Sequence, residues 1–252
     1  MFNFFVEKSD RQDSRYFITG SDCNHIKNVL RMKTDEKILV SCDGVTDLCY
    51  ISSIDDSCVI ADIEQENYQS TDLPVKIYLY QGLPKSDKME LIIQKTVELG
   101  VHSVIPTQMH RCVVKLDDKK KKSKTARWQS ISESAAKQSK RSTIPEISDV
   151  MSFTQALDSI KEMDLVIVPY ESKRGMQDTK DALSKIKKGM SVAVFIGPEG
   201  GFEESEVDKL IEKGAVTVSL GQRILRTETA AITATAMCML YTEMTINGDN
   251  ND

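Results

Sequence analysis

Short apolar runs alternate with polar turn residues over the first 70 residues of the chain. Three of these runs, rich in β-branched residues, follow one another between residues 37 and 65, and Asp-Gly and Asp-Asp pairs separate them. Such pairs are typical of turns, and short strands joined by turns are typical of small barrels. The polar segment 67–74 predicts a linker after this region. We therefore expect a small β-barrel domain over residues 1–70.

The pattern changes after this linker, because apolar runs now alternate with segments of helical periodicity. Strands are predicted over residues 75–83, 103–109, 164–170, 191–197 and 215–221, and helices over 86–100, 123–141, 152–163, 178–189, 203–214 and 229–244. Apolar strands that alternate with helices predict a parallel sheet covered on both faces. We expect residues 71–252 to form this second, α/β domain.

The distribution of charge is more informative than its sum. The chain has 252 residues, of which 40% are hydrophobic, and this is ample for a buried core. A net charge of −5 argues weakly against nucleic-acid binding. Residues 115–128, however, carry seven basic side chains against two acidic ones. This stretch either contacts phosphates or forms a solvated loop and helix face, and both interpretations stay open.

The sequence gives little indication of a metal site, of disulfide bonds or of a membrane-spanning segment. The six cysteines form no C-x-x-C pair and the three histidines show no metal-ligand spacing, so we expect reduced thiols and no metal site. The apolar runs are too short to span a bilayer, and the N-terminus lacks the features of a signal peptide. We expect a cytoplasmic protein without a membrane-spanning segment.

Three predicted strands end in segments that could form one ligand site. Residues 196–202 have the sequence IGPEGGF, residues 220–230 have the sequence LGQRILRTETA, and a third strand ends at residues 168–172. Ligands of parallel sheets bind where the strands end. The glycine loop lacks the Lys-Ser or Lys-Thr pair of a P-loop and does not match G-x-G-x-x-G. Acidic residues follow the loop and would repel a triphosphate, so we expect a different ligand.

Both loops resemble those of the SPOUT methyltransferases, in particular the RsmE family. Other segments match that family in the same order along the chain, namely residues 25–32, 85–101, 111–115 and 127–147. The chain departs from the family's usual residues at Asn3, Lys140, Glu203 and Gln222. An arginine often occupies the position of Asn3, so one RNA contact of the family is in doubt here.

The resemblance implies an enzyme that uses S-adenosylmethionine to methylate uridine N3 in the 16S ribosomal RNA of the small ribosomal subunit. It also implies a PUA-like RNA-binding domain at the N-terminus and a SPOUT domain with a deep trefoil knot. A homodimer is implied as well, in which the partner helps to close the site. No metal is required, because methyl transfer is a displacement at an already activated carbon.

The same resemblance suggests site residues. Cofactor contacts are expected from Val168, Glu171, Ile196, Gly197, Pro198, Glu199, Gly200, Gly201, Leu220, Gly221, Ile224, Leu225, Arg226 and Thr229. RNA contacts are expected from His25, Arg31, Arg111, Lys115, Arg127, Lys140 and Arg141. Arg226 is the first candidate, and Arg141 the second, to stabilise negative charge on the uracil oxygens. Glu228 either accepts the proton or positions a partner, or it pairs with Arg226 in a purely structural role.

Two other functions fit parts of the pattern. One is a SPOUT enzyme that methylates ribose 2′-OH or a tRNA base, although the Asn and Arg block of the ribose methylators is not clearly found. The other is an RNA-binding or assembly protein that kept the fold without catalysis. Complete cofactor loops argue against this second alternative, and the affinity for S-adenosylmethionine would discriminate between it and an enzyme.

Overall fold

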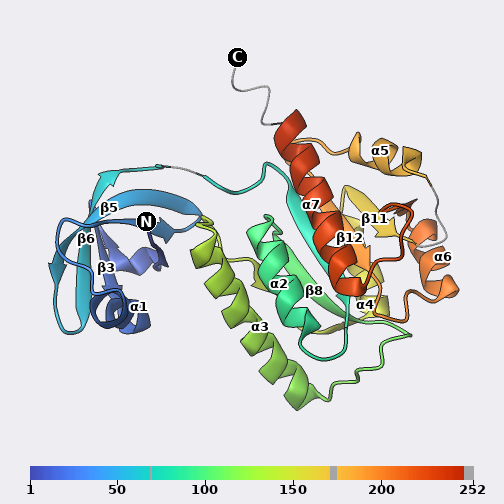
Figure 1. Cartoon of the computed structure of the whole chain (residues 1–252), viewed down its shortest axis with the longest axis horizontal. Helices are drawn as coiled ribbons and strands as arrows, with labels where there is room; N and C mark the ends of the chain where they lie inside the picture. Colours follow the sequence, from blue (N-terminus) through green and yellow to red (C-terminus); the bar gives the residue numbers. More distant parts are fainter. Residues whose placement is uncertain (69, 171–174, 247–252) are drawn as a thin grey trace. The chain divides into compact units, whose positions relative to one another are not determined.

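A computed structural model describes residues 1–68, 70–170 and 175–246, and it divides into two compact units (Figure 1). The first unit comprises Met1–Asp72 together with Ala136–Ile144, and the second comprises Leu73–Ala135 together with Pro145–Asp252. The segment Ala136–Ile144 therefore packs within the first unit although it lies far from it in the sequence.

The first unit is built on a six-stranded mixed sheet in the order β1-β4-β5-β6-β3-β2, which curls into a half-barrel. Its strands are β1 Asn3–Phe5, β2 Arg11–Gln12, β3 Arg15–Thr19, β4 Lys37–Cys42, β5 Val45–Ile54 and β6 Cys58–Gln65. β1 pairs with β4 in parallel, and the other pairs are antiparallel. One face buries Phe4, Tyr16 and Ile18 against the helical turns α1 Gly20–Asn24 and His25–Val29, which contribute Ile26. The expectation of a small PUA-like β domain is confirmed.

A buried polar network holds the segment Ala136–Ile144 in this unit. Asn3 donates a hydrogen bond through Nδ2 to the carbonyl oxygen of Arg141 at 2.9 Å, and Ser41 donates to Asn3 Oδ1 at 3.0 Å. Thr46 donates to Ser142 Oγ at 2.9 Å. Buried polar groups need such partners, so the segment completes the half-barrel by satisfying them. Asn3, which stands where the RsmE family often has arginine, thus has a structural contact.

The second unit is built on a seven-stranded sheet in which all pairs are parallel, as expected. Its strand order is β10-β8-β7-β12-β11-β13, and β9 pairs with β8. The strands are β7 Lys76–Gly82, β8 Ser103–Gln108, β9 Glu146–Ile147, β10 Met151–Ser152, β11 Leu165–Pro169, β12 Ser191–Ile196 and β13 Val216–Val218. The central strands β7 and β12 bury Ile77, Leu79, Val192 and Val194 completely.

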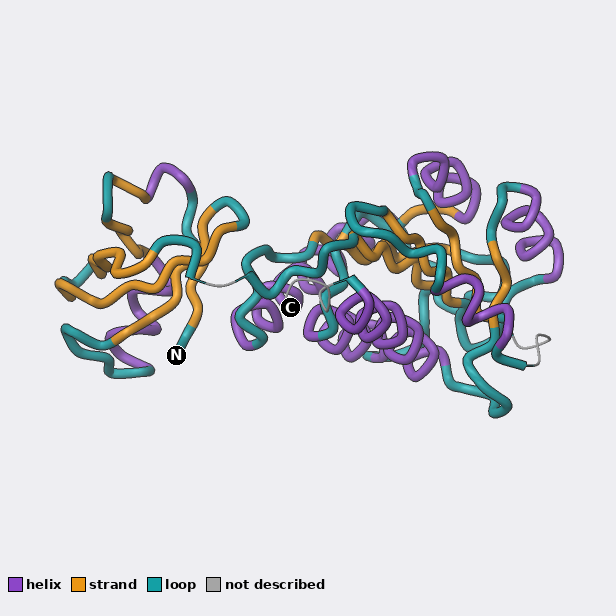
Figure 2. The backbone as a smooth tube through the Cα atoms, turned by 90° about the horizontal axis from the view of Figure 1, so that it is seen from above, coloured by secondary structure: helices purple, strands orange, loops and turns teal. Residues whose placement is uncertain are grey.

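Helices lie on both sides of this sheet (Figure 2). They are α2 Lys88–Glu98, α3 Asp118–Gln138, α4 Phe153–Ser159, α5 Gln177–Leu183, α6 Glu204–Glu212 and α7 Thr227–Thr245. α2 packs against α7. α3 begins at Asp118 rather than at residue 123, because the Asp117 carboxylate accepts the Lys120 N–H at 2.8 Å and so caps the helix. Within the described residues, no helix has the length and apolar composition that crossing a membrane requires.

Candidate active site

The glycine loop follows β12 and is packed tightly against the end of β7. A Cβ atom at Gly82 would lie 2.7 Å from the Pro198 ring, so only glycine fits at this strand end. Gly201 has a φ of +69°, a left-handed conformation that favours glycine. On the outer side of the loop, Arg111 donates a hydrogen bond through Nη1 to the carbonyl oxygen of Gly200 at 3.1 Å. Close packing thus leaves little room for a side chain at Gly197 or Gly200, where a Cβ atom would lie 3.1 Å from its nearest neighbour.

The start of α7 is hydrogen-bonded to the same loop. The Thr227 hydroxyl donates to the carbonyl oxygen of Gly197 at 2.7 Å and accepts from Gln81 Nε2 at 3.0 Å. Gln81 is the residue before Gly82 in β7 and is completely buried. Its Oε1 has no hydrogen-bond partner among the described residues. The end of β7, the glycine loop and the start of α7 therefore meet at one place.

An ionic cluster lies beside these hydrogen bonds. Lys88 Nζ is 3.1 Å from Glu199 Oε1 and 3.3 Å from Glu228 Oε2. Glu199 also accepts the Lys85 N–H at 3.0 Å. Burial alone would raise the pKa of Glu199, but the backbone N–H groups and the Lys88 ammonium outweigh it and lower that pKa. Glu199 is therefore an ionised carboxylate that is held by residues of the loop preceding α2 and by the first residue of α2.

Arg226 is exposed at the N-terminus of α7, and none of the described residues forms an ion pair or a hydrogen bond with its guanidinium. Glu228, its suggested partner, lies next to Lys88 instead. The buried Glu228 Oε2 is the atom that faces the Lys88 ammonium, at 3.3 Å. The start of α7 thus presents a guanidinium that pairs with none of the described residues and a carboxylate held by Lys88.

The other expected cofactor contacts come from neighbouring strands. β11 lies between β12 and β13, so the strand ends at Pro169, Ile196 and Val218 are adjacent in the sheet. Val168 and Ile196 are buried, whereas Ile224 is 79% exposed. Leu220 and Leu225 are half-buried, and Thr229 is exposed. Glu171 lies outside the described residues. A Cβ atom at Gly201 or Gly221 would meet nothing within 4 Å, so the backbone is open to a ligand at both positions.

The residues expected to contact RNA have different surroundings. His25, Arg31 and Lys140 are exposed in the first unit. In the second unit Lys115 is exposed, and Arg127 makes two hydrogen bonds to Glu90, at 2.6 and 2.9 Å. Arg111, by contrast, touches the glycine loop.

Arg141 differs from all of these candidates. It is only 4% exposed, and its guanidinium donates to Asp72 Oδ1 at 2.8 Å. The structure gives the Arg141 guanidinium an ion pair with Asp72 within the first unit.

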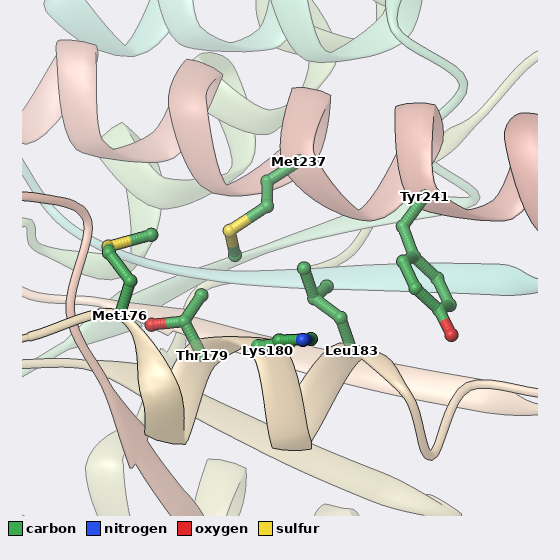
Figure 3. Close-up of a pocket in the computed structure, with 6 residues that line it drawn as sticks. All are labelled: Met176, Thr179, Lys180, Leu183, Met237 and Tyr241. Carbon is green, nitrogen blue, oxygen red and sulfur yellow. The ribbon is translucent and has the colours of Figure 1, made fainter.

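A separate apolar pocket of about 230 Å³ lies between α5 and α7. Figure 3 shows Met237 and Tyr241 extending from α7 toward Leu183 of α5. Met176, Thr179 and Lys180 complete the lining. Because the pocket is small and lacks several converging polar groups, it does not suit a charged nucleoside. Within the described residues, no cluster of three histidine, cysteine, aspartate or glutamate side chains could hold a metal ion.

Comparison with known proteins identifies the family. Residues 71–239 match the model of the RNA methyltransferase domain, and residues 18–64 match that of the RNA methyltransferase PUA domain. The chain is 42% identical over 259 aligned positions to ribosomal RNA small subunit methyltransferase E of Bacillus subtilis, covering 99% of this chain and all of the relative. The chain belongs to the RsmE family.

Two further RsmE proteins extend this comparison. The enzyme of Mesomycoplasma hyopneumoniae is 30% identical, covering 95% of this chain and 99% of the relative. The crystal structure of the enzyme from Neisseria gonorrhoeae, bound to S-adenosyl methionine, is 29% identical and superposes with a TM-score of 0.78. That superposition covers 94% of this chain and 95% of the other. The likeness therefore includes both units of this RsmE protein.

Sequence analysis missed three residues that build the site, namely Gln81, Lys88 and Thr227. One sequence feature could have revealed Gln81, because it is a polar residue at the end of a mostly apolar strand. β7 pairs directly with β12, so its carboxyl end must lie beside the glycine loop. A strand order was needed to draw this conclusion.

Proposed function

We propose that this RsmE protein transfers a methyl group from S-adenosylmethionine to N3 of a uridine in the 16S ribosomal RNA of the small subunit. The supporting observation is that Thr227 joins the glycine loop to the start of α7, beside the Arg226 guanidinium, which pairs with none of the described residues. The uridine N3 position follows from the resemblance of both loops to those of the RsmE family.

The loops fit a nucleoside that carries a positive centre. The open backbone at Gly201 and Gly221 allows close contact with a flat ring, and Ile224 offers an uncovered apolar side chain. Lys88 neutralises only one of the two carboxylates around it, so the cluster keeps a negative charge that favours a cation. S-adenosylmethionine, when bound, supplies an activated methyl group on a positively charged sulfur.

Arg226 and Glu228 are the proposed catalytic residues. Uridine N3 carries a proton, and its loss leaves negative charge on the flanking carbonyl oxygens. A guanidinium fixed at a helix start and free of ion pairs with the described residues can stabilise this charge. Glu228 is the candidate to receive the proton, because its carboxylate lies in the first turn of the same helix.

The homodimer and the trefoil knot are part of the proposal, because both belong to the family resemblance. Exposed apolar side chains on α7 support a dimer, since Leu240 is 50% and Met244 is 70% exposed. A cytoplasmic location would follow from a ribosomal substrate. Light scattering should give twice the mass of one chain at micromolar concentration, and a monomer would contradict the dimer.

Incubation of the protein with S-adenosylmethionine and unmethylated small ribosomal subunits tests the activity. Nuclease digestion and mass spectrometry should reveal 3-methyluridine in the 16S ribosomal RNA. A 2′-O-methylated nucleoside, or methylation of tRNA instead, would favour a different SPOUT activity. Binding of S-adenosylmethionine without transfer to any RNA would favour a binding protein.

A further inference from the structure

Lys88 is the first residue of α2, and its side chain joins two segments that approach α2 from different parts of the chain. Its ammonium lies within 3.3 Å of the Glu199 carboxylate in the glycine loop and of the Glu228 carboxylate in α7. One cation therefore bridges the loop proposed to hold the cofactor and the helical turn proposed to act on the uridine.

The balance of charge makes this bridge important. Without the ammonium, the carboxylates of Glu199 and Glu228 would face each other as like charges. The side chains of Lys88, Glu199 and Glu228 are 30%, 27% and 15% exposed, so water screens them only in part. A hydrogen bond to Glu199 raises the pKa of Lys88, burial opposes this effect, and Glu228 adds to it. The Lys88 ammonium is thus charged when it holds the two carboxylates.

The position of Arg226 depends on the same bridge. Arg226 is the N-cap residue of α7, and Glu228 lies in the first turn of that helix. Movement of this turn away from the glycine loop would carry the guanidinium with it. The hydrogen bond from Thr227 to Gly197 fixes the buried side of the junction, and Lys88 fixes the more exposed side.

We propose that Lys88 is a positioning residue for methyl transfer, which holds the glycine loop and the first turn of α7 in register through Glu199 and Glu228. This inference rests on the proposed methyltransferase function. Lys88 needs no contact with RNA or cofactor for this role, because it acts through the two carboxylates.

The positioning role and an ordinary surface ion pair predict different results. Partly exposed ion pairs contribute little to stability, so replacement of Lys88 should change the melting temperature only slightly. Misplacement of reacting groups by about 1 Å can reduce a rate by about a hundredfold. A large loss of rate with a small loss of stability is therefore the signature of positioning.

The test compares Lys88→Met and Lys88→Arg with Lys95→Met as the matched control. Lys95 lies on the same helix and pairs with Glu98 at 2.8 Å, away from the site. Single-turnover methyl transfer is measured at saturating RNA and cofactor, together with the melting temperature. Lys88→Met should lower the rate by about tenfold to a hundredfold. Lys88→Arg should recover part of this loss, and Lys95→Met should behave as wild type.

The double variant Lys88→Met/Glu199→Gln examines the charge balance directly. It removes one of the like charges left by Lys88→Met, so it should be faster than Lys88→Met alone. A rate of Lys88→Met within twofold of wild type would overturn the inference, as would a loss of rate explained entirely by unfolding. If the wild-type protein methylates no RNA, the proposed function is refuted and the inference fails with it. An active wild type with an unaffected Lys88→Met refutes the inference alone.

Discussion

The hydroxyl of Thr227 donates a hydrogen bond to the carbonyl oxygen of Gly197 over 2.7 Å and joins two segments that are 30 residues apart in the sequence. Gln81 donates to the same hydroxyl oxygen from the end of β7. A single side chain thus connects three segments at the carboxyl edge of the sheet. The position of the glycine loop depends on this hydroxyl, because it bonds to the loop and to β7 at once.

Thr227→Val keeps the shape of the side chain and removes the hydroxyl. The carbonyl oxygen of Gly197 and Nε2 of Gln81 would each lose a hydrogen bond, which typically costs about 1–3 kcal/mol for a buried group. We expect a lower melting temperature and weaker binding of S-adenosylmethionine by calorimetry. Thr245→Val is the control, because among the described residues that hydroxyl donates only to the carbonyl oxygen of Tyr241, at the exposed end of α7. Unchanged cofactor affinity in Thr227→Val would contradict the proposed place of the loop in the cofactor site.

Arg141→Met should affect the stability of the first unit and leave methyl transfer intact in the folded protein. The substitution leaves the Asp72 carboxylate without the guanidinium, and loss of one partner of a buried pair costs about 3–5 kcal/mol. Because Asp72 is 26% exposed and also bonds Thr143, we expect a smaller loss of about 2 kcal/mol in denaturant unfolding.

A suitable control for Arg141→Met is Arg15→Met, which breaks a more exposed pair with Asp62 in the same unit. This variant should cost about 1 kcal/mol or less. Normal stability of Arg141→Met combined with slow single-turnover methylation would instead return Arg141 to the catalytic residues.

The lysines at the start of α3 should contribute to RNA affinity and not to cofactor affinity. Replacement of Lys119, Lys120, Lys121 and Lys122 by alanine should reduce the salt dependence of RNA binding, with a slope that falls by about 0.7–0.9 for each phosphate that these lysines neutralise. The control replaces the same number of exposed lysines elsewhere, namely Lys185, Lys187, Lys188 and Lys213. Equal slopes for the two quadruple variants would mean that the α3 lysines form a solvated face.

The parallel sheet was predictable because its strands are continuous apolar runs. The run over residues 191–197 became β12 Ser191–Ile196, with an error of a single residue. The start of α3 was not predictable from periodicity, since a lysine-rich turn carries no apolar stripe and begins at a cap formed by Asp117. The family resemblance identified both loops of the candidate site.

The contacts that hold these loops together could not be predicted, because they join residues distant in the sequence. Thr227 and Gln81 are separated by 146 positions, and only the strand order brings them together. The buried place of Arg141 has the same origin. Its partner Asp72 is 69 positions away in the sequence and ends the other of the two segments that form the first unit. A basic residue within a basic stretch gives no sign that it is buried.

Arg226→Ala should lower the rate of methyl transfer without weakening cofactor binding. The guanidinium has no ion pair with any described residue, so its removal should cost little stability. If it stabilises charge on the uracil oxygens, its effect arises in the transition state, and loss of such a donor typically costs about a hundredfold or more. Single-turnover rates at saturating RNA and cofactor, cofactor affinity and melting temperature should be measured together. Arg226→Lys should recover only part of the rate, because an ammonium lacks the planar fork of a guanidinium.

Comparison of Glu228→Gln with Arg226→Ala shows whether these two residues act in catalysis or only support the loop before α7. The rival explanation is that Arg226 and Glu228 only shape the loop before α7, in which case both Arg226→Ala and Glu228→Gln would weaken cofactor binding and lower the melting temperature. The structure places Glu228 beside Lys88 and not in an ion pair with Arg226, so we expect the two variants to differ. Arg226→Ala should keep its stability, whereas Glu228→Gln should lose part of the ionic contact with α2. A normal single-turnover rate for Arg226→Ala would exclude Arg226 from the catalytic residues, and the charge on the uracil oxygens would then need another donor.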